Sequence, residues 1–112
     1  MTLEAEGNSK VTFSDLPVSE AVAWVGKMPH HSTLTFGGEL NHPTYLDIPS
    51  FYLITKNGKI IRPEMQRSLV DAASEPRESP IMEYSIPTGH FPFISQPSML
   101  VEVVRKVAGE IL

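Results

Sequence analysis

A short, unbroken apolar run in the middle of the chain constrains the fold most. Phe51-Tyr52-Leu53-Ile54 is aromatic and branched, and it lies between Pro49 and Asn57-Gly58, so it is too short to form a helix. Runs of this kind are typical of strands that are buried on both faces, as in a parallel sheet. We therefore expect a strand here, within a fold that covers both of its faces.

The segments after this run alternate between helix and strand patterns. Pro63 opens a predicted helix from Glu64 to about Ser74, and the residues expected to face inward are Met65, Leu69, Ala72 and Ala73. Ile81–Ile86 is a second predicted strand, and Pro97 begins a last helix with an apolar stripe of Leu100, Val103, Val104, Val107, Ala108 and Ile111. This order predicts an α/β fold with a short parallel sheet and flanking helices.

The segments before the run are less regular. Residues 1–12 are predicted to be a flexible N-terminus because Met1–Lys10 is polar, which leaves residues 13–112 as a single domain. Val18–Lys27 is predicted to be a short helix with Val18, Ala21, Val22 and Val25 on one face. His30–Pro49 contains Gly37-Gly38 and Pro43, and predicts a long excursion such as a lid.

Composition excludes several classes of protein. The 112 residues are 41% hydrophobic and 20% charged, which is typical of a folded chain. The net charge of −4, with scattered Lys and Arg, argues against nucleic acid as a partner. The sequence has no apolar run that could cross a bilayer, no signal segment and no cysteine for a disulfide or a thiolate metal site. We expect a cytoplasmic protein that does not bind membranes.

Two parallel strands are too few to form a stable sheet. Their edges and faces need cover from further strands or helices. We therefore expect the chain to complete its core with another polypeptide. The simplest arrangement is a homodimer, and the alternative is a complementary subunit that carries more strands.

The segment Pro87–Phe93 holds the strongest candidate for chemistry. Its Gly89-His90 pair lies between a predicted strand and a predicted helix, where many hydrolytic enzymes keep their general base. We expect His90 to act as an acid or base on a small apolar substrate, with a pocket lined by Phe91, Phe93, Phe36 and Tyr45. The sequence has no Gly-x-Ser-x-Gly elbow for a nucleophilic serine, and no cysteine replaces it.

Three blocks of sequence together resemble the C-terminal third of the α/β-hydrolase superfamily. They are Ile48–Thr55, Ile60–Gln66, and Gly89–Phe93 with Gln96-Pro97. The similarity is to the branch with plant hydroxynitrile lyases and methylesterases, and it extends over about Phe13 to Leu112. In that superfamily the catalytic triad runs Ser, Asp or Glu, then His along the chain. The resemblance implies that His90 occupies the histidine position, whereas Gly58 stands where the acid is usual.

These departures change the chemistry that the resemblance implies. A general base is usually held in one tautomer by a carboxylate, and serine hydrolysis also needs the nucleophile. Acid–base catalysis by His90, which contributes roughly 10²–10⁴-fold, suits a non-hydrolytic biosynthetic enzyme of the isomerase, cyclase, dehydratase or lyase type. The alternatives are a non-catalytic remnant or accessory chain that binds a partner subunit, and a hydrolase whose nucleophile and acid come from a separate chain.

For the other histidines and for three acidic residues, the sequence predicts structural roles. His30-His31 and His42 have no Asp or Glu at a ligand-like offset, so we expect neither a metal nor a cofactor. Asp15 and Asp47 lie beside prolines and are predicted to form turns or caps. Asp47 and Glu64 are the possible replacements for the missing acid, although a turn and a helix start explain them.

Overall fold

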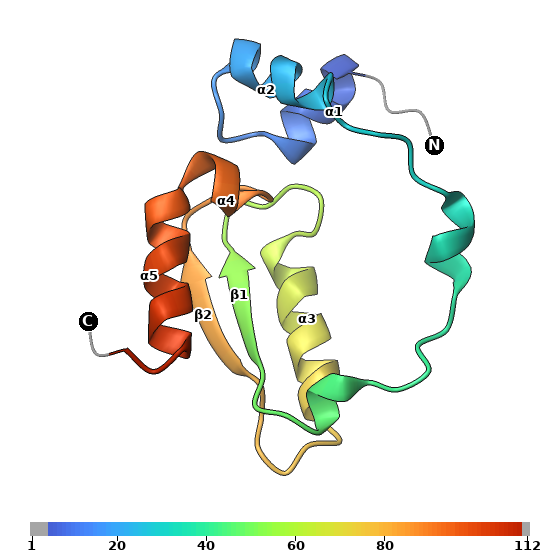
Figure 1. Cartoon of the computed structure of the whole chain (residues 1–112), viewed down its shortest axis with the longest axis vertical. Helices are drawn as coiled ribbons and strands as arrows, with labels where there is room; N and C mark the ends of the chain where they lie inside the picture. The colour runs from blue at the N-terminus through green and yellow to red at the C-terminus, as the bar shows by residue number, and fades with distance from the viewer. Residues whose placement is uncertain (1–4, 111–112) are drawn as a thin grey trace.

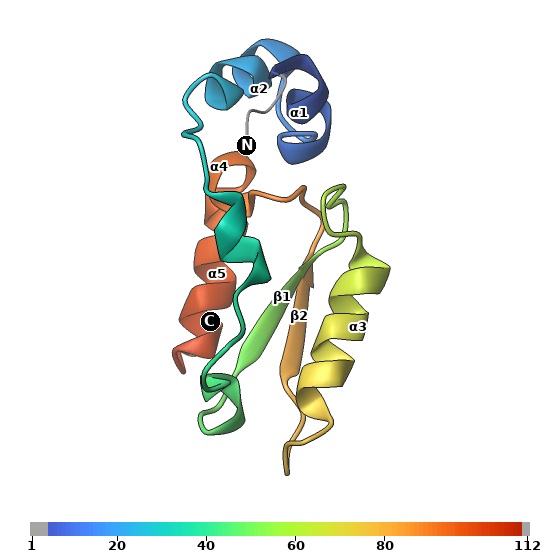
Figure 2. The same cartoon turned by 90° about the vertical axis from the view of Figure 1, so that its right-hand side faces the viewer.

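The computed structural model describes residues 5–110 and contains a two-stranded parallel sheet between helices (Figure 1). β1 (Phe51–Thr55) and β2 (Met82–Ile86) pair from Phe51 opposite Met82 to Thr55 opposite Ile86. α3 (Pro63–Ser74) connects the strands, and α5 (Pro97–Val107) lies on the other side of the sheet (Figure 2). The predicted α/β arrangement with a parallel pair of strands and flanking helices is confirmed.

β1 is less buried than its apolar sequence predicts. Ile54 and Thr55 are buried, Tyr52 and Leu53 are half-buried, and Phe51 is exposed. The expectation of a strand covered on both faces is therefore wrong for the chain by itself. The physical reason is the width of the sheet, since a strand with a single neighbour keeps an open edge and receives only partial cover from the helices.

The edge of β1 that faces away from β2 is closed at one point by a side chain. The Lys56 N–H donates to the Ile86 carbonyl at 3.0 Å, so the backbone groups of the preceding residue, Thr55, point to the opposite edge. There the Gln66 amide accepts from the Thr55 N–H at 3.0 Å and donates to the Thr55 carbonyl at 3.1 Å. The amide of Gln66 thus takes the place that a neighbouring strand would occupy.

This contact sets the rotation of α3 and reverses the predicted inward face. Gln66 and Val70 are buried, whereas Met65 is 57% exposed and Leu69 is 47% exposed. Ala72 is exposed as well, whereas Ala73, the fourth residue predicted to face inward, is half-buried. A polar residue therefore occupies the inward face, because it bonds to backbone groups that no strand pairs. Within residues 5–110 the apolar row of Met65, Leu69 and Ala72 stays exposed.

The N-terminal part forms a helical hairpin of α1 (Ala5–Thr12) and α2 (Val18–Val25). Phe13, Ala21 and Val25 form its buried core. Residues 5–12, within the segment expected to be a flexible N-terminus, are helical. The buried positions of α1 hold the small polar residues Ser9 and Thr12, which give no apolar periodicity. α2 agrees with the helix predicted from Val18, although Val18 and Val22 are exposed.

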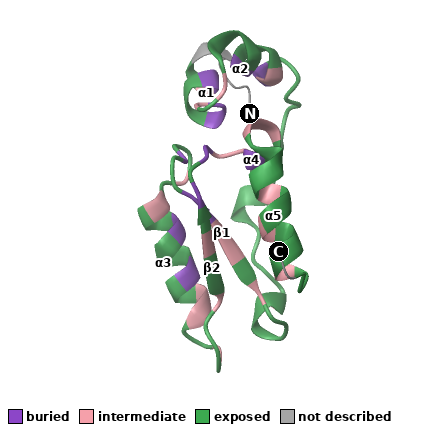
Figure 3. Cartoon of the chain, turned by 90° about the vertical axis from the view of Figure 1, so that its left-hand side faces the viewer, coloured by how far each residue is buried: buried purple, intermediate pink, exposed green. Residues whose placement is uncertain are grey.

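A long, exposed linker joins the hairpin to the sheet, as the sequence predicts for His30–Pro49. It contains two short 3₁₀ helices, Thr33–Gly37 and Thr44–Leu46. Figure 3 shows that the linker is exposed along its length, and Phe36 is 71% exposed. The linker is therefore exposed to water over most of its length, and its last residues are held to the end of the sheet by Arg77, which donates to the Ile48 carbonyl.

The C-terminal part has one helix more than the sequence predicts. α4 (Pro92–Ser95) is a single turn between the His90 loop and α5. On α5 the side chains of Leu100, Val103 and Val107 are half-buried, whereas Val104 and Ala108 are exposed, and Ile111 lies outside the described residues. None of the helices within residues 5–110 has the length and apolarity needed to cross a bilayer.

Candidate functional site

His90 lies on the loop that follows β2, at the carboxyl end of the parallel strands (Figure 1). In open α/β sheets this is the end where ligands bind. The turn that follows β1 lies beside the loop, because the Asn57 N–H donates to the Thr88 carbonyl at 3.0 Å. The expected location of His90, on a loop between a strand and a helix, agrees with the structure.

The backbone before His90 is held from several directions. Thr88 is fully buried, and its N–H donates to the Ile86 carbonyl at 2.9 Å. The Gly89 N–H donates to Oδ2 of Asp15 at 2.8 Å. Asp15 belongs to the turn between α1 and α2, so this hydrogen bond joins the helical hairpin to the loop that carries His90.

The imidazole of His90 is half-buried against an aromatic ring. Its centroid lies 4.8 Å from that of Phe91, with an angle of 69° between the rings. Burial lowers the pKa of His90 below the usual 6.5, so the neutral ring, which is able to accept a proton, predominates at pH 7. Among the described residues no hydrogen bond reaches a ring nitrogen, so the described part of the chain does not fix the tautomer as a triad carboxylate would.

Gly58 has no room for a side chain. A Cβ at this buried position would lie 2.9 Å from Oγ1 of Thr55 and 3.1 Å from the carbonyl oxygen of Ile61. The Gly58 N–H also donates to the Thr55 carbonyl at 3.1 Å, which draws the turn tightly against β1. The turn at Gly58 is therefore too tight to hold an acidic side chain in place of the glycine.

Two of the four predicted pocket residues lie near His90. Phe91 contacts it, and the Phe91 ring lies 5.1 Å from Phe93 and 5.3 Å from Phe13. Phe91 joins the core of the hairpin, whereas Phe93 is exposed. Phe36 and Tyr45 lie in the linker, which Figure 1 shows well away from α4. The structure therefore places Phe91 against His90, with Phe93 beside Phe91, and leaves Phe36 and Tyr45 apart from His90.

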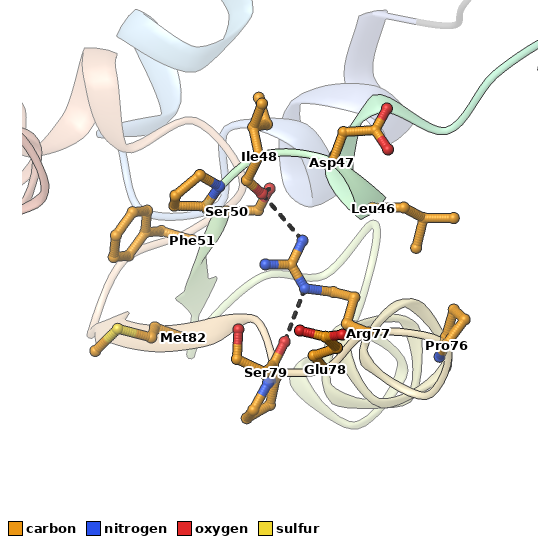
Figure 4. Close-up of a pocket in the computed structure, with 12 residues that line it drawn as sticks. Leu46, Asp47, Ile48, Ser50, Phe51, Pro76, Arg77, Glu78, Ser79 and Met82 are labelled. Atoms are coloured by element: carbon orange, nitrogen blue, oxygen red, sulfur yellow. Dashed lines mark hydrogen bonds between the residues drawn. The ribbon is translucent and has the colours of Figure 1, made fainter.

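A hollow of about 640 Å³ lies at the opposite end of the sheet, where the strands begin (Figure 4). Residues 46–51, residues 76–80 and Met82 line it. Arg77 spans it by donating to the carbonyls of Ile48 at 3.1 Å and Ser79 at 2.9 Å. This hollow includes the last residues of the predicted excursion, but His90 is not part of its wall, so it differs from the pocket that the sequence predicts.

The carboxylate that reaches the His90 loop is Asp15, which the sequence suggests only as a turn or cap residue. It binds the backbone 74 residues away along the chain, and no local pattern could have revealed this contact. Asp47 instead pairs with His42 in the linker, and Glu64 lies in the first turn of α3. Within residues 5–110 no three His, Asp or Glu residues are grouped so that they could hold a metal ion.

No family model matches the chain, and no curated protein matches it. The resemblance to α/β hydrolases therefore depends on the three sequence blocks alone. The geometry described above is the remaining guide to function.

Proposed function

We propose that the chain is an accessory α/β subunit, which binds a second polypeptide and completes its fold in the complex. The observation that carries this proposal is the surface area of the chain. It exposes 8156 Å², whereas a compact monomer of this mass exposes about 6,100 Å². The radius of gyration is 16.0 Å, compared with about 13 Å for a compact domain of this length.

The chain exposes more surface than a compact monomer of its mass, and this excess area is large enough for a stable interface. It amounts to about 2,000 Å² for each chain, and part of it belongs to the linker. If two chains each bury only half of the excess, the interface reaches about 2,000 Å² in total, which is the lower end of the range for obligate complexes. A second copy of the chain is the simplest partner, because it supplies the same excess surface.

The apolar row on α3 and the open end of β1 form the surface that this proposal uses. Met65 and Leu69 are exposed beside the buried Gln66. Along the same edge of β1, Phe51 and Leu53 present backbone groups in the direction of those of Thr55, since alternate residues of a strand point the same way. A partner that lies here covers apolar side chains and unpaired strand edge together.

Light scattering after size exclusion tests the proposal, with and without a cell extract. We expect the wild-type chain to elute at twice its mass or more. Met65→Lys with Leu69→Lys should yield a folded monomer, because both side chains are exposed in the single chain. Val101→Lys with Val104→Lys, on equally exposed positions of α5, is the matched control and should still assemble. A wild-type monomer under all of these conditions contradicts the proposal.

Acid–base catalysis by His90 is the second candidate function. It is favoured by the half-buried imidazole, whose lowered pKa keeps the ring neutral and able to accept a proton near pH 7. The reaction would be an isomerisation, cyclisation, dehydration or lyase step on a small apolar substrate beside Phe91 and Phe93. Mass spectrometry of metabolite extracts incubated with wild type or His90→Ala tests this function. A product formed only by the wild type supports catalysis, and identical product profiles exclude it.

A further inference from the structure

The turn between α1 and α2 contacts both neighbours of His90. Oδ2 of Asp15 accepts the Gly89 N–H at 2.8 Å, and the Phe13 ring lies 5.3 Å from the Phe91 ring. We propose that Asp15 is a positioning residue for His90, which fixes the peptide between Thr88 and Gly89 at the Gly89 N–H and so holds the loop that places the imidazole against Phe91. This inference goes beyond the proposed function, because it concerns the His90 loop and requires neither a partner nor a substrate.

The fit between Asp15 and Gly89 is close. A Cβ on Gly89 would lie 2.6 Å from Oδ1 and 2.9 Å from Cγ of Asp15, and 3.2 Å from Oγ of Ser14. The carboxylate therefore lies against the bare Cα of a buried glycine. Gly89 does not have a positive φ, so the need for glycine comes from this close approach and not from the backbone conformation.

The peptide that Asp15 holds at the Gly89 N–H is also held at its carbonyl end, from the side of β1. Thr88 is fully buried, and its carbonyl accepts the Asn57 N–H at 3.0 Å. The N–H of this peptide, on Gly89, donates to Asp15, and the next carbonyl, that of Gly89, accepts from Oγ1 of Thr88 at 3.2 Å. Removal of the carboxylate should therefore loosen the Gly89 side of the loop and let the imidazole move, while the Asn57 contact keeps the β2 end in place.

The pKa of His90 reports in solution whether its imidazole is still held in its half-buried position. A released imidazole gains water, and its pKa should then rise towards the usual 6.5 because desolvation no longer opposes the charged form. Asp15→Ala removes the acceptor of the Gly89 N–H. Asp15→Asn removes the charge but keeps an oxygen that can accept the same hydrogen bond. The two variants thus separate positioning from a direct effect of the charge.

NMR titration of the histidine rings in the full chain tests the inference, with the His90 signals assigned by their loss in His90→Gln. We expect a pKa below 6.5 in the wild type and in Asp15→Asn, and a pKa close to 6.5 in Asp15→Ala. An unchanged pKa in Asp15→Ala overturns the inference. So does a pKa that falls in both Asp15→Ala and Asp15→Asn, because loss of a nearby negative charge disfavours the charged imidazole, and the carboxylate would then act through its charge and not through the hydrogen bond.

Gly89→Ala provides a second approach that does not depend on the folding of Asp15→Ala. Its Cβ would displace the carboxylate, so this variant should raise the pKa of His90 as Asp15→Ala does. The double variant should show no further rise, because both changes break one contact. Additive shifts, or an unchanged pKa in a folded Gly89→Ala, contradict a positioning role.

Discussion

Two residues determine what the carboxyl end of β1 can do. Gly58 allows the turn to close tightly on Thr55, which leaves no room for a side chain at this position. Gln66 closes the edge of the strand at the same residue, through its hydrogen bonds with the Thr55 backbone. The environment of Thr55 is thus organised to stabilise the strand end and not to present a carboxylate to His90.

Gly58→Ala should destabilise the chain by about 1–3 kcal/mol, because its Cβ overlaps with a packed side chain and two carbonyls. Gly37→Ala is the matched control: it adds the same methyl group where nothing lies within 4 Å, so its effect should be within about 0.5 kcal/mol. Urea unfolding followed by circular dichroism measures both variants. Equal stability of the two variants would show that the turn at Gly58 has room for a side chain.

The sequence predicts only part of the candidate site. The position of His90 between β2 and the last helices follows from local apolar patterns, and so does the proximity of Phe91 and Phe93. The hydrogen bond from Gly89 to Asp15 joins residues 74 apart. Such a contact depends on how the hairpin packs on the His90 loop, which no local pattern of residues specifies.

At the scale of elements, α3 and β1 form a unit whose centre is polar. The Gln66 amide also donates to the Ile61 carbonyl at 2.7 Å and to Oγ1 of Thr55 at 3.1 Å. Periodicity predicts that residues 64–74 are helical, but it assigns Met65 and Leu69 to the inward face because they are apolar. That assignment fails because an unpaired strand edge favours an amide, which can donate and accept at once.

Gln66→Leu tests this unit. The substitution leaves the buried Thr55 N–H without its acceptor, at about 1–3 kcal/mol, whereas the Thr55 carbonyl loses one donor and keeps the Gly58 N–H. We therefore expect a loss of at least about 1 kcal/mol in urea unfolding. Arg67→Leu, at the exposed neighbouring position, should change stability by less than about 0.5 kcal/mol. A Gln66→Leu variant as stable as the wild type would show that the amide is not needed at this edge.

At the scale of the whole molecule, the chain consists of two small parts, the α1–α2 hairpin and the sheet with α3, α4 and α5. Both parts expose large apolar side chains. The hairpin packs on the His90 loop through Phe13 and Phe91, and the long linker that returns to β1 leaves Phe36 exposed. A chain whose apolar surface is covered only in a complex should gain part of its stability from association. Its unfolding then depends on protein concentration, because the partner binds the folded state alone.

Thermal unfolding of the wild type should therefore shift to higher temperature as the protein concentration rises. Under mass action, a concentration one hundred times the dissociation constant adds about 2.7 kcal/mol to the stability of the folded state. Met65→Lys with Leu69→Lys should unfold at one temperature at every concentration, and this temperature should match that of the dilute wild type, since the exposed positions contribute little to the single chain. Differential scanning calorimetry over two orders of magnitude in concentration measures both. A wild-type midpoint that does not move with concentration would mean that the surface on α3 and β1 stays open to water in the folded protein, and the proposal of self-association would fail.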